Sequence, residues 1–246
     1  MMRMFKRKSL YFSFSAAFVA FIMTLSTRAQ SSVEYGYSRT MRIAGPAFKP
    51  MTDVEGTPYV PGDSVEQGWL ILGAKRIPVK LHYNSYTGEA EYVDNNRVLA
   101  APNMVMEFTI LVPDTLHFKR GFPTAGNWSA SDFYQILFDG RKTKLVKHIA
   151  TSIKVNTDAM SNDHGKKKFQ KREEYYVWIA SEKPPTENYA EKLSDGVLKS
   201  VVTGKKSLTN LFPQDADRID QYVADQKLKL KTWDEFARVL RHLETM

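Results

Sequence analysis

The sequence predicts a β-rich α+β protein in which an antiparallel meander sheet, curved into a half-barrel or a sandwich, is closed by C-terminal helices. Apolar and polar residues alternate at a period of two through much of the range 68–180. Turn signals separate these runs, and no helical pattern lies between them. Near the C-terminus the apolar period changes to that of a helix, so the two kinds of element are segregated along the chain.

Period-two alternation is clearest in the range 77–83, where every second residue is apolar and these residues share one face of a strand. Asn95-Asn96 predicts a tight hairpin turn because asparagine tolerates a positive φ angle. Asp139-Gly140 is the strongest short hairpin signal in the chain. Further strands are expected at 69–72, 89–93, 106–112, 133–138, 143–149 and 174–180.

The chain divides into four predicted segments. Residues 1–29 are expected to be a signal peptide, and residues 30–67, punctuated by proline and glycine, an extended segment. The antiparallel β domain spans 68–180, and a helical segment at 181–246 closes the same domain. Within the β domain, the charged range 156–172 predicts an exposed loop, with a lysine-rich binding patch as the alternative.

Two or three helices are predicted in the C-terminal segment. Pro213 suits the first turn of one helix because its fixed φ angle and missing N–H cost nothing there. Thr232 and Glu235 form a capping box that begins a second helix. Apolar residues at helical spacing then give this helix one apolar face, so we expect it to dock on the sheet or on the preceding helix.

The range 1–29 has the three regions of a secretory signal peptide. Four basic residues lie within 3–8, the range 10–25 is uncharged and apolar, and Thr27-Arg28-Ala29 places small residues where signal peptidase reads. An uncleaved anchor helix is the alternative, but the apolar range is shorter than the roughly 20 residues that span a bilayer. We therefore expect an exported protein, periplasmic, outer-membrane associated or extracellular, with no membrane span after cleavage.

Charge and cysteine content exclude several classes of function. The formal net charge is +8, but residues 1–29 hold five of the 35 basic residues and none of the 27 acidic ones, which leaves +3 for the rest. That balance gives no case for a nucleic-acid partner, which needs a basic footprint on the folded domain. The chain has no cysteine, so it has no disulfide, thiolate metal site or cysteine nucleophile.

Several stretches of the chain resemble uncharacterised secreted proteins of Bacteroidota-type bacteria. Such proteins have a signal peptide that ends in Ala-Gln, a strand that leads into a Tyr-Asn turn, and a pair of hairpins. The matching pieces here are Ala29-Gln30, the range 79–84, the range 133–137 with Asp139-Gly140, and the range 219–223. The resemblance covers most of residues 68–243 as a pattern. It implies an exported β-rich protein, and it implies no activity, cofactor or site residue.

The sequence contains no recognisable catalytic or metal motif. Its five histidines include His82 and His148, which lie on or next to predicted strands, but no two histidines lie within five residues of each other. A zinc site assembled from distant strands is the alternative. Neither a Gly-x-Ser-x-Gly elbow nor a phosphate-binding glycine loop is present. We therefore predict no catalytic residue, no metal ligand and no cofactor.

Three residues are candidates for ligand binding: Glu89, Glu91 and Tyr176. The two glutamates are two positions apart on a predicted strand, so they share a face at a backbone separation of roughly 7 Å. That distance overlaps the carboxylate separation in inverting glycosidases, although an ordinary polar strand face is the simpler interpretation. Tyr175 and Tyr176 point to opposite faces of their strand, and we expect Tyr176 to be an exposed contact residue.

The function expected from these observations is binding rather than catalysis. The aromatic residues of the predicted strands favour core packing, with a platform for sugar rings as the alternative. A predicted signal peptide together with the lack of a catalytic motif favours a non-enzymatic envelope protein. Such a protein would bind another envelope protein, a glycan or a lipid-like ligand. A glycan-directed hydrolase or a carbohydrate-binding protein is the alternative hypothesis.

Overall fold

The computed structural model describes residues 47, 49, 51–158, 160, 162–181 and 193–245. The predicted signal peptide lies outside the described residues, as do residues 30–46 of the predicted extended segment. Within the part of the chain that is described, no helix combines the length and the apolar character needed to cross a membrane.

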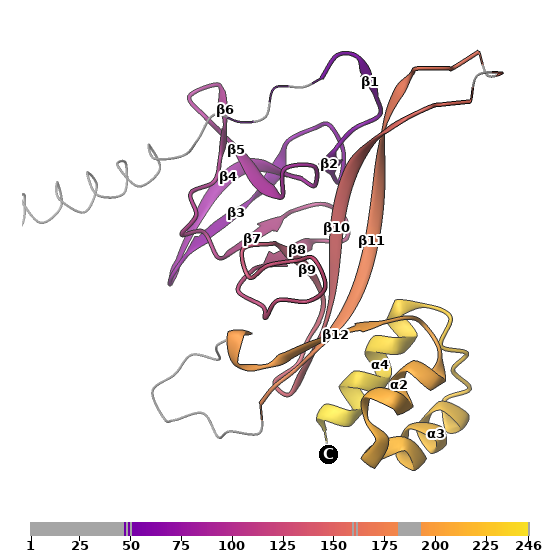
Figure 1. Ribbon diagram of the computed structural model, residues 1–246. Helices are drawn as coiled ribbons and strands as arrows, with labels where there is room; N and C mark the ends of the chain where they lie inside the picture. Colours follow the sequence, from indigo (N-terminus) through magenta and orange to yellow (C-terminus); the bar gives the residue numbers. More distant parts are fainter. Residues whose placement is uncertain are drawn as a thin grey trace, which may run out of the picture. The chain divides into compact units, whose positions relative to one another are not determined.

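In the described part of the chain, twelve strands form one sheet, shown in Figure 1. Its spatial order is β1-β11-β10-β9-β8-β7-β3-β4-β5-β6, with β12 paired to β11 and β2 paired to β4. The sheet is open and mostly antiparallel, with β1 and β11 pairing in parallel. The strands are β1 (Val54–Glu55), β2 (Tyr59–Val60), β3 (Glu66–Leu72), β4 (Lys75–Asn84), β5 (Glu89–Asp94), β6 (Arg97–Ala100), β7 (Glu107–Ile110), β8 (Leu116–Lys119), β9 (Tyr134–Asp139), β10 (Thr143–Val155), β11 (Lys167–Ile179) and β12 (Val197–Val201).

The two hairpin signals are confirmed. Asn95 and Asn96 have φ angles of 48° and 61°, and they join β5 to β6 directly. Two consecutive residues with positive φ match the right-handed twist of the flanking strands. At the second signal, β9 ends at Asp139 and β10 begins at Thr143.

β10 and β11 are the longest strands, and their pairing corrects the predicted loop at 156–172. The ladder runs without interruption from Thr143 opposite Ile179 to Val155 opposite Lys167, so residues 167–172 belong to β11. Their side chains are mostly exposed, so no apolar alternation in the sequence indicates a strand here. The backbone hydrogen bonds to β10 hold these residues in the strand instead. The basic residues in this range are partly neutralised by ion pairs: Lys166 with Asp163, Lys167 with Asp53, and Lys168 with Glu55.

An aromatic cluster packs among β4, β7, β8 and Phe133, the residue before β9. The rings of Phe108 and Phe118 stack with centroids 4.7 Å apart, and Phe133 meets Phe108 edge-on at 4.9 Å. Tyr83 completes the cluster 5.0 Å from Phe118. All four side chains are at most 2% exposed, so core packing is the role of these aromatic residues.

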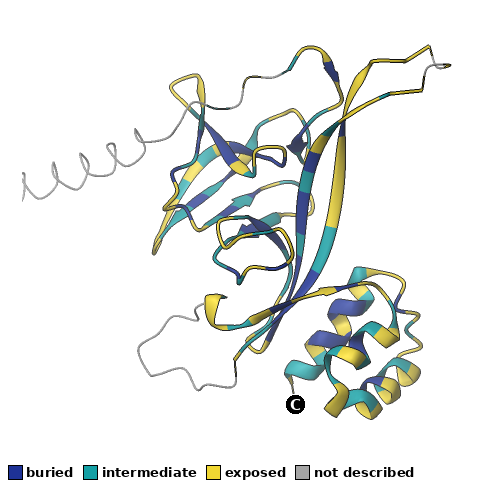
Figure 2. Cartoon of the chain, viewed as in Figure 1, coloured by how far each residue is buried: buried dark blue, intermediate teal, exposed yellow. Residues whose placement is uncertain are grey.

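The C-terminal helices pack on β10 and β11. They are α2 (Lys205–Leu211), α3 (Ala216–Asp225) and α4 (Trp233–Glu244), with 3-10 turns at Leu193–Asp195 and Pro213–Asp215. One buried cluster joins Leu145 and Val177 of the sheet to helical residues such as Leu208, Ile219 and Phe236. Figure 2 shows the buried side of the helices in dark blue. The β-rich α+β class with docked C-terminal helices is confirmed, although β12 makes the range 181–246 less purely helical than expected.

The predicted capping box at the start of α4 is also confirmed. Thr232 Oγ1 accepts a hydrogen bond from Glu235 N at 3.3 Å, and Glu235 Oε2 accepts one from Thr232 N at 3.4 Å. We expect Thr232→Ala to lower the free energy of unfolding by about 1 kcal/mol, because an orphan N–H of the first turn loses its partner. Urea unfolding measures this, with exposed Thr203→Ala as the matched control, and equal stabilities of the two variants would contradict the prediction.

Candidate functional site

A cavity of about 310 Å³ lies where β9 stops pairing with β10. The last β9–β10 pair is Tyr134 opposite His148, whereas β10 continues to Val155. The turn after β4 bridges to this continuation: Thr151 N donates to Ser85 O at 2.8 Å, and the two hydroxyls are 2.7 Å apart. We call the cavity between these segments the His148 cavity.

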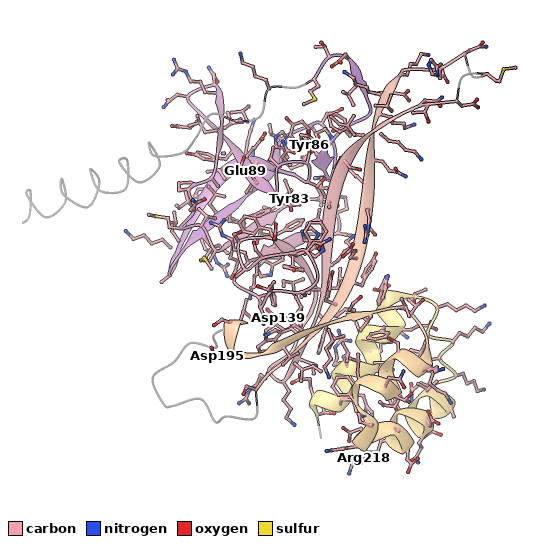
Figure 3. The ribbon with its side chains drawn as sticks, viewed as in Figure 1. Tyr83, Tyr86, Glu89, Asp139, Asp195 and Arg218 are labelled. Carbon is pink, nitrogen blue, oxygen red and sulfur yellow. The ribbon has the colours of Figure 1, made fainter. Side chains whose placement is uncertain are left out.

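The lining of the His148 cavity combines hydroxyl, aromatic and charged side chains. Ser85, Thr87, Thr151 and Ser152 contribute the hydroxyl-bearing residues. The other side-chain groups of the wall come from Tyr83, Tyr86, Trp128, Asp132, His148, Ile149 and Arg172. Figure 3 labels two of these residues, Tyr83 on β4 and Tyr86 in the turn after it. Ring faces beside several hydroxyls suit a compact ligand that carries both C–H and O–H groups.

His148 is buried against two aromatic rings. Trp128 stacks on its imidazole with centroids 3.9 Å apart, and the Tyr134 ring meets it edge-on at 5.2 Å. Burial lowers the pKa of His148 despite the opposing charges of Asp132 and Glu174, so the imidazole is neutral at pH 7. His148 Nδ1 and the Tyr134 hydroxyl have no hydrogen-bond partner among the described residues. A buried unsatisfied polar group costs roughly 1–3 kcal/mol, so two of them side by side are unusual.

Glu174 holds the aromatic wall in place. Its Oε2 accepts hydrogen bonds from Trp128 Nε1 at 2.7 Å and from the Tyr176 hydroxyl at 2.6 Å, and its other oxygen pairs with Arg172. Burial works to raise the pKa of Glu174, but the hydrogen bonds from Trp128 and Tyr176 outweigh it, and the pKa lies below its ordinary value. Glu174 is therefore an ionised structural acceptor.

This depressed pKa predicts a loss of stability in acid. A carboxylate with a lowered folded pKa stabilises the fold above its unfolded pKa of 4.5, and that contribution is lost as the pH falls through the folded pKa. We expect Glu174→Gln to be less stable than wild type at pH 7, with a difference that shrinks as the pH is lowered through the folded pKa. Urea unfolding across this range is the measurement, with exposed Glu55→Gln as the control. A difference that stays constant with pH would contradict the prediction.

The structure corrects the exposure that was expected for Tyr176. This residue is 4% exposed, and its hydroxyl is committed to Glu174. Tyr175, on the opposite face, is half-buried and stacks on Trp233 of α4 at 3.9 Å. Both rings are covered because the sheet has helices on one side and the Trp128 segment on the other.

The structure places the two predicted carboxylates in different environments. Glu89 is exposed, and burial of part of its surface together with the charge of Glu91 raises its pKa. Glu91 is fully buried and accepts hydrogen bonds from Asn84 Nδ2 at 3.0 Å, while His82 Nε2 lies 3.1 Å from its other oxygen. Tyr59 of β2 stacks on His82 at 3.9 Å and covers this face. The polar strand face that was expected here is therefore wrong for Glu91, and neither glutamate lines the His148 cavity.

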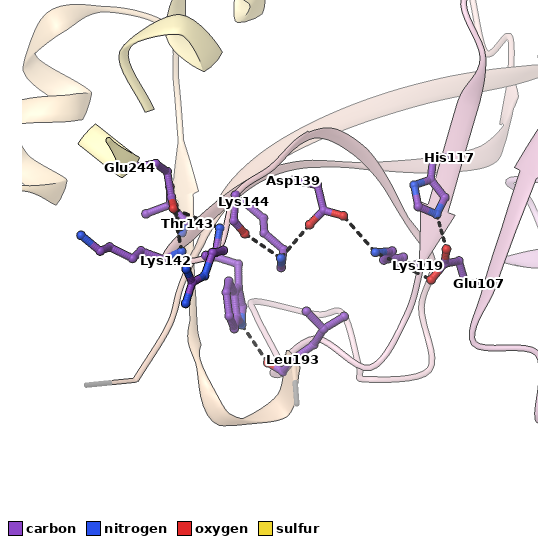
Figure 4. A network of polar contacts seen from close by, with 12 residues as sticks. Glu107, His117, Lys119, Asp139, Lys142, Thr143, Lys144, Leu193 and Glu244 are labelled. Atoms are coloured by element: carbon purple, nitrogen blue, oxygen red, sulfur yellow. Dashed lines mark hydrogen bonds and ion pairs between the residues drawn. The ribbon is translucent and has the colours of Figure 1, made fainter. Parts of the chain in front are cut away.

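A second polar network, shown in Figure 4, ties the β9–β10 loop to its neighbours. Asp139 accepts from Lys144 at 2.6 Å and from Lys119 at 2.9 Å. Burial raises the pKa of Asp139, but these two hydrogen bonds outweigh it and bring the pKa below its ordinary value. Because the lysines neutralise its charge, Asp139 holds the strand ends together and offers no free carboxylate to a ligand.

The His148 cavity was not predicted as a unit. His148 was noted as a strand residue, but Trp128 and Glu174 come from separate segments, and their meeting depends on the register of β10 on β11. The one usable signal was the position of a histidine among apolar residues on a long strand. Within the described ranges, no group of three or more metal-ligand side chains lies close enough to hold a metal ion.

The fold and the cavity together define an open, mostly antiparallel β-sheet protein with a polar, aromatic-walled cavity beside its longest strand. No known family model matches the chain, and no curated protein or solved structure is significantly similar to it.

Proposed function

We propose that the protein is an exported, non-enzymatic binding module of the cell envelope, and that it holds a small polar ligand in the His148 cavity. The observation that carries the proposal is the cavity itself, because it places hydroxyl side chains, aromatic rings and the charged residues Asp132 and Arg172 around one concave space. Export rests on the signal-peptide pattern of residues 1–29.

The chemistry of the nearby carboxylates favours binding over glycan hydrolysis. A hydrolase of the two-carboxylate type needs one protonated acid and one free carboxylate, both facing the substrate. Glu174 is ionised and engaged by Trp128 and Tyr176, and Glu91 is buried behind Tyr59. Asp132 is the one carboxylate among the described lining residues, and it accepts hydrogen bonds from Ser129, so the lining holds no facing pair of carboxylates.

Filling the cavity tests the proposal. Ala150 lines the cavity next to His148, so Ala150→Trp occupies the space with an indole ring. The matched control is Ala224→Trp, the same substitution at an exposed residue of α3. The probes are monosaccharides, sugar acids, amino sugars, amino acids and dicarboxylates, each presented to the purified protein in saturation-transfer NMR.

We expect at least one probe class to bind wild type and Ala224→Trp and to lose binding to Ala150→Trp. Binding that survives in Ala150→Trp, or the absence of binding by every class, would overturn the proposal. Circular dichroism of the variants confirms that each one is folded before its binding is compared.

A further inference from the structure

His148, in the wall of the His148 cavity, and Tyr134, which packs against it, each carry a buried polar atom. His148 is 3% exposed and Tyr134 is fully buried, and they face each other as the last cross-strand pair of β9 and β10. His148 Nδ1 and the Tyr134 hydroxyl lack hydrogen-bond partners among the described residues. Buried polar groups in folded proteins nearly always have a partner, so such a pair beside a cavity indicates a binding subsite.

Trp128 lies between the open cavity and this pair. Trp128 and His148 both line the cavity, whereas Tyr134 does not, and the Tyr134 ring packs edge-on against His148. Trp128 is held by backbone hydrogen bonds in both directions with Ala125 and by its indole N–H on Glu174. A ligand can reach both atoms only if this indole moves, because it stacks on the His148 ring.

The chemistry of the two atoms selects the ligand group. A neutral imidazole has one donor and one acceptor nitrogen, and a protonated phenol can donate and accept. Burial keeps His148 uncharged by lowering its pKa and keeps Tyr134 protonated by raising its pKa. A hydroxyl group also donates and accepts, so it matches both atoms whichever imidazole tautomer is present.

Charged groups fit this position less well. A carboxylate or phosphate only accepts hydrogen bonds, and it would stand near the carboxylates of Asp132 and Glu174. An ammonium only donates hydrogen bonds, so it fits only the tautomer in which His148 Nδ1 is an acceptor. The four hydroxyl-bearing side chains and the aromatic rings of the wall instead suit a ring that has several hydroxyls and apolar C–H faces.

We infer that the ligand of the His148 cavity is a neutral sugar or polyol, one hydroxyl of which is seated between His148 Nδ1 and the Tyr134 hydroxyl behind Trp128. This inference rests on the proposed binding function and names the chemical class of its ligand. Trp128 acts as the movable wall of the subsite, and Glu174 holds it when no ligand is bound.

The test compares neutral and charged sugars on wild type and on Tyr134→Phe. The probes are methyl glycosides of glucose, galactose, mannose and N-acetylglucosamine, each paired with its uronic acid or its amino sugar. Tyr222→Phe, the same substitution on α3, is the control. We expect a neutral glycoside to bind more tightly than its charged counterpart, and Tyr134→Phe to weaken that binding on the order of tenfold, the loss of one hydrogen bond.

Stability gives an independent readout of the same substitution. Because the Tyr134 hydroxyl has no partner in the described structure, Tyr134→Phe should keep or raise the melting temperature while it weakens binding. A variant that loses binding and also melts at a lower temperature would overturn the subsite. Equal binding of a neutral glycoside by wild type and Tyr134→Phe would overturn it as well.

The outcomes separate this inference from the function on which it rests. If only charged probes bind, and Ala150→Trp abolishes their binding, the sugar inference fails and the binding function stands. If no probe binds wild type, both fail.

Discussion

Replacing Gly68 with alanine is expected to lower the free energy of unfolding by about 3 kcal/mol, the upper end of the usual cost of overpacking. A Cβ atom at Gly68 would lie 2.1 Å from Thr109 O and 2.4 Å from Leu81 Cδ2. The oxygen belongs to the backbone of β7, which is hydrogen-bonded to β3, so it cannot move away without disturbing the ladder. Leu81 is fully buried, so its side chain has no free space to enter.

Gly62→Ala is the matched control, because a Cβ at Gly62 meets no atom within 4 Å. Urea unfolding of the two variants and wild type gives the comparison. We expect Gly62→Ala to stay within about 0.5 kcal/mol of wild type. Gly68→Ala at the same stability as Gly62→Ala would mean that β3 and β7 do not approach each other this closely.

Glu244→Ala is expected to cost about 2 kcal/mol and to loosen α4 from the sheet. Glu244, the last residue of α4, accepts hydrogen bonds from the backbone N–H groups of Arg141, Lys142 and Thr143 and from the Thr143 hydroxyl. Figure 4 shows this carboxylate at the β9–β10 loop. One side chain thereby satisfies three donors that the loop leaves unpaired, and alanine returns all three to solvent.

Amide hydrogen exchange shows whether the loss is local. We expect faster exchange at residues 141–143 and in α4 of Glu244→Ala, with β3–β7 protection unchanged. Asp225→Ala, which removes an exposed carboxylate from the end of α3, is the control. Unchanged exchange at 141–143 would show that the carboxylate does not hold the loop.

Local signals in the sequence predicted the elements that depend on local physics. Asn95-Asn96 forms its turn because asparagine tolerates positive φ, and Thr232 with Glu235 forms its cap because both partners lie within one helical turn. The strand at 167–172 was missed because its charged residues show no apolar alternation, and its pairing with β10 is decided by a partner strand elsewhere in the chain.

The candidate site was less predictable because it depends on what covers each strand. Alternation assigns Glu91 to a face, but only the packing of Tyr59 on His82 decides that this face is buried. Alternation likewise assigned Tyr176 to a face of its strand, and we expected that face to be exposed. In the structure, Trp128 and Glu174 enclose the Tyr176 side chain. Contacts among segments this distant in sequence leave no local pattern.

The indole N–H signals of the protein test the central claim most directly. The chain has four tryptophans, and Trp128 is the one that lines the His148 cavity. In a ¹H–¹⁵N correlation spectrum, with Trp128→Phe used for assignment, a neutral methyl glycoside should shift the Trp128 indole signal saturably and leave the other three in place. Such a shift, absent in Ala150→Trp, is the result predicted here. A Trp128 signal that stays fixed while another indole responds would contradict the assignment of the ligand to the His148 cavity.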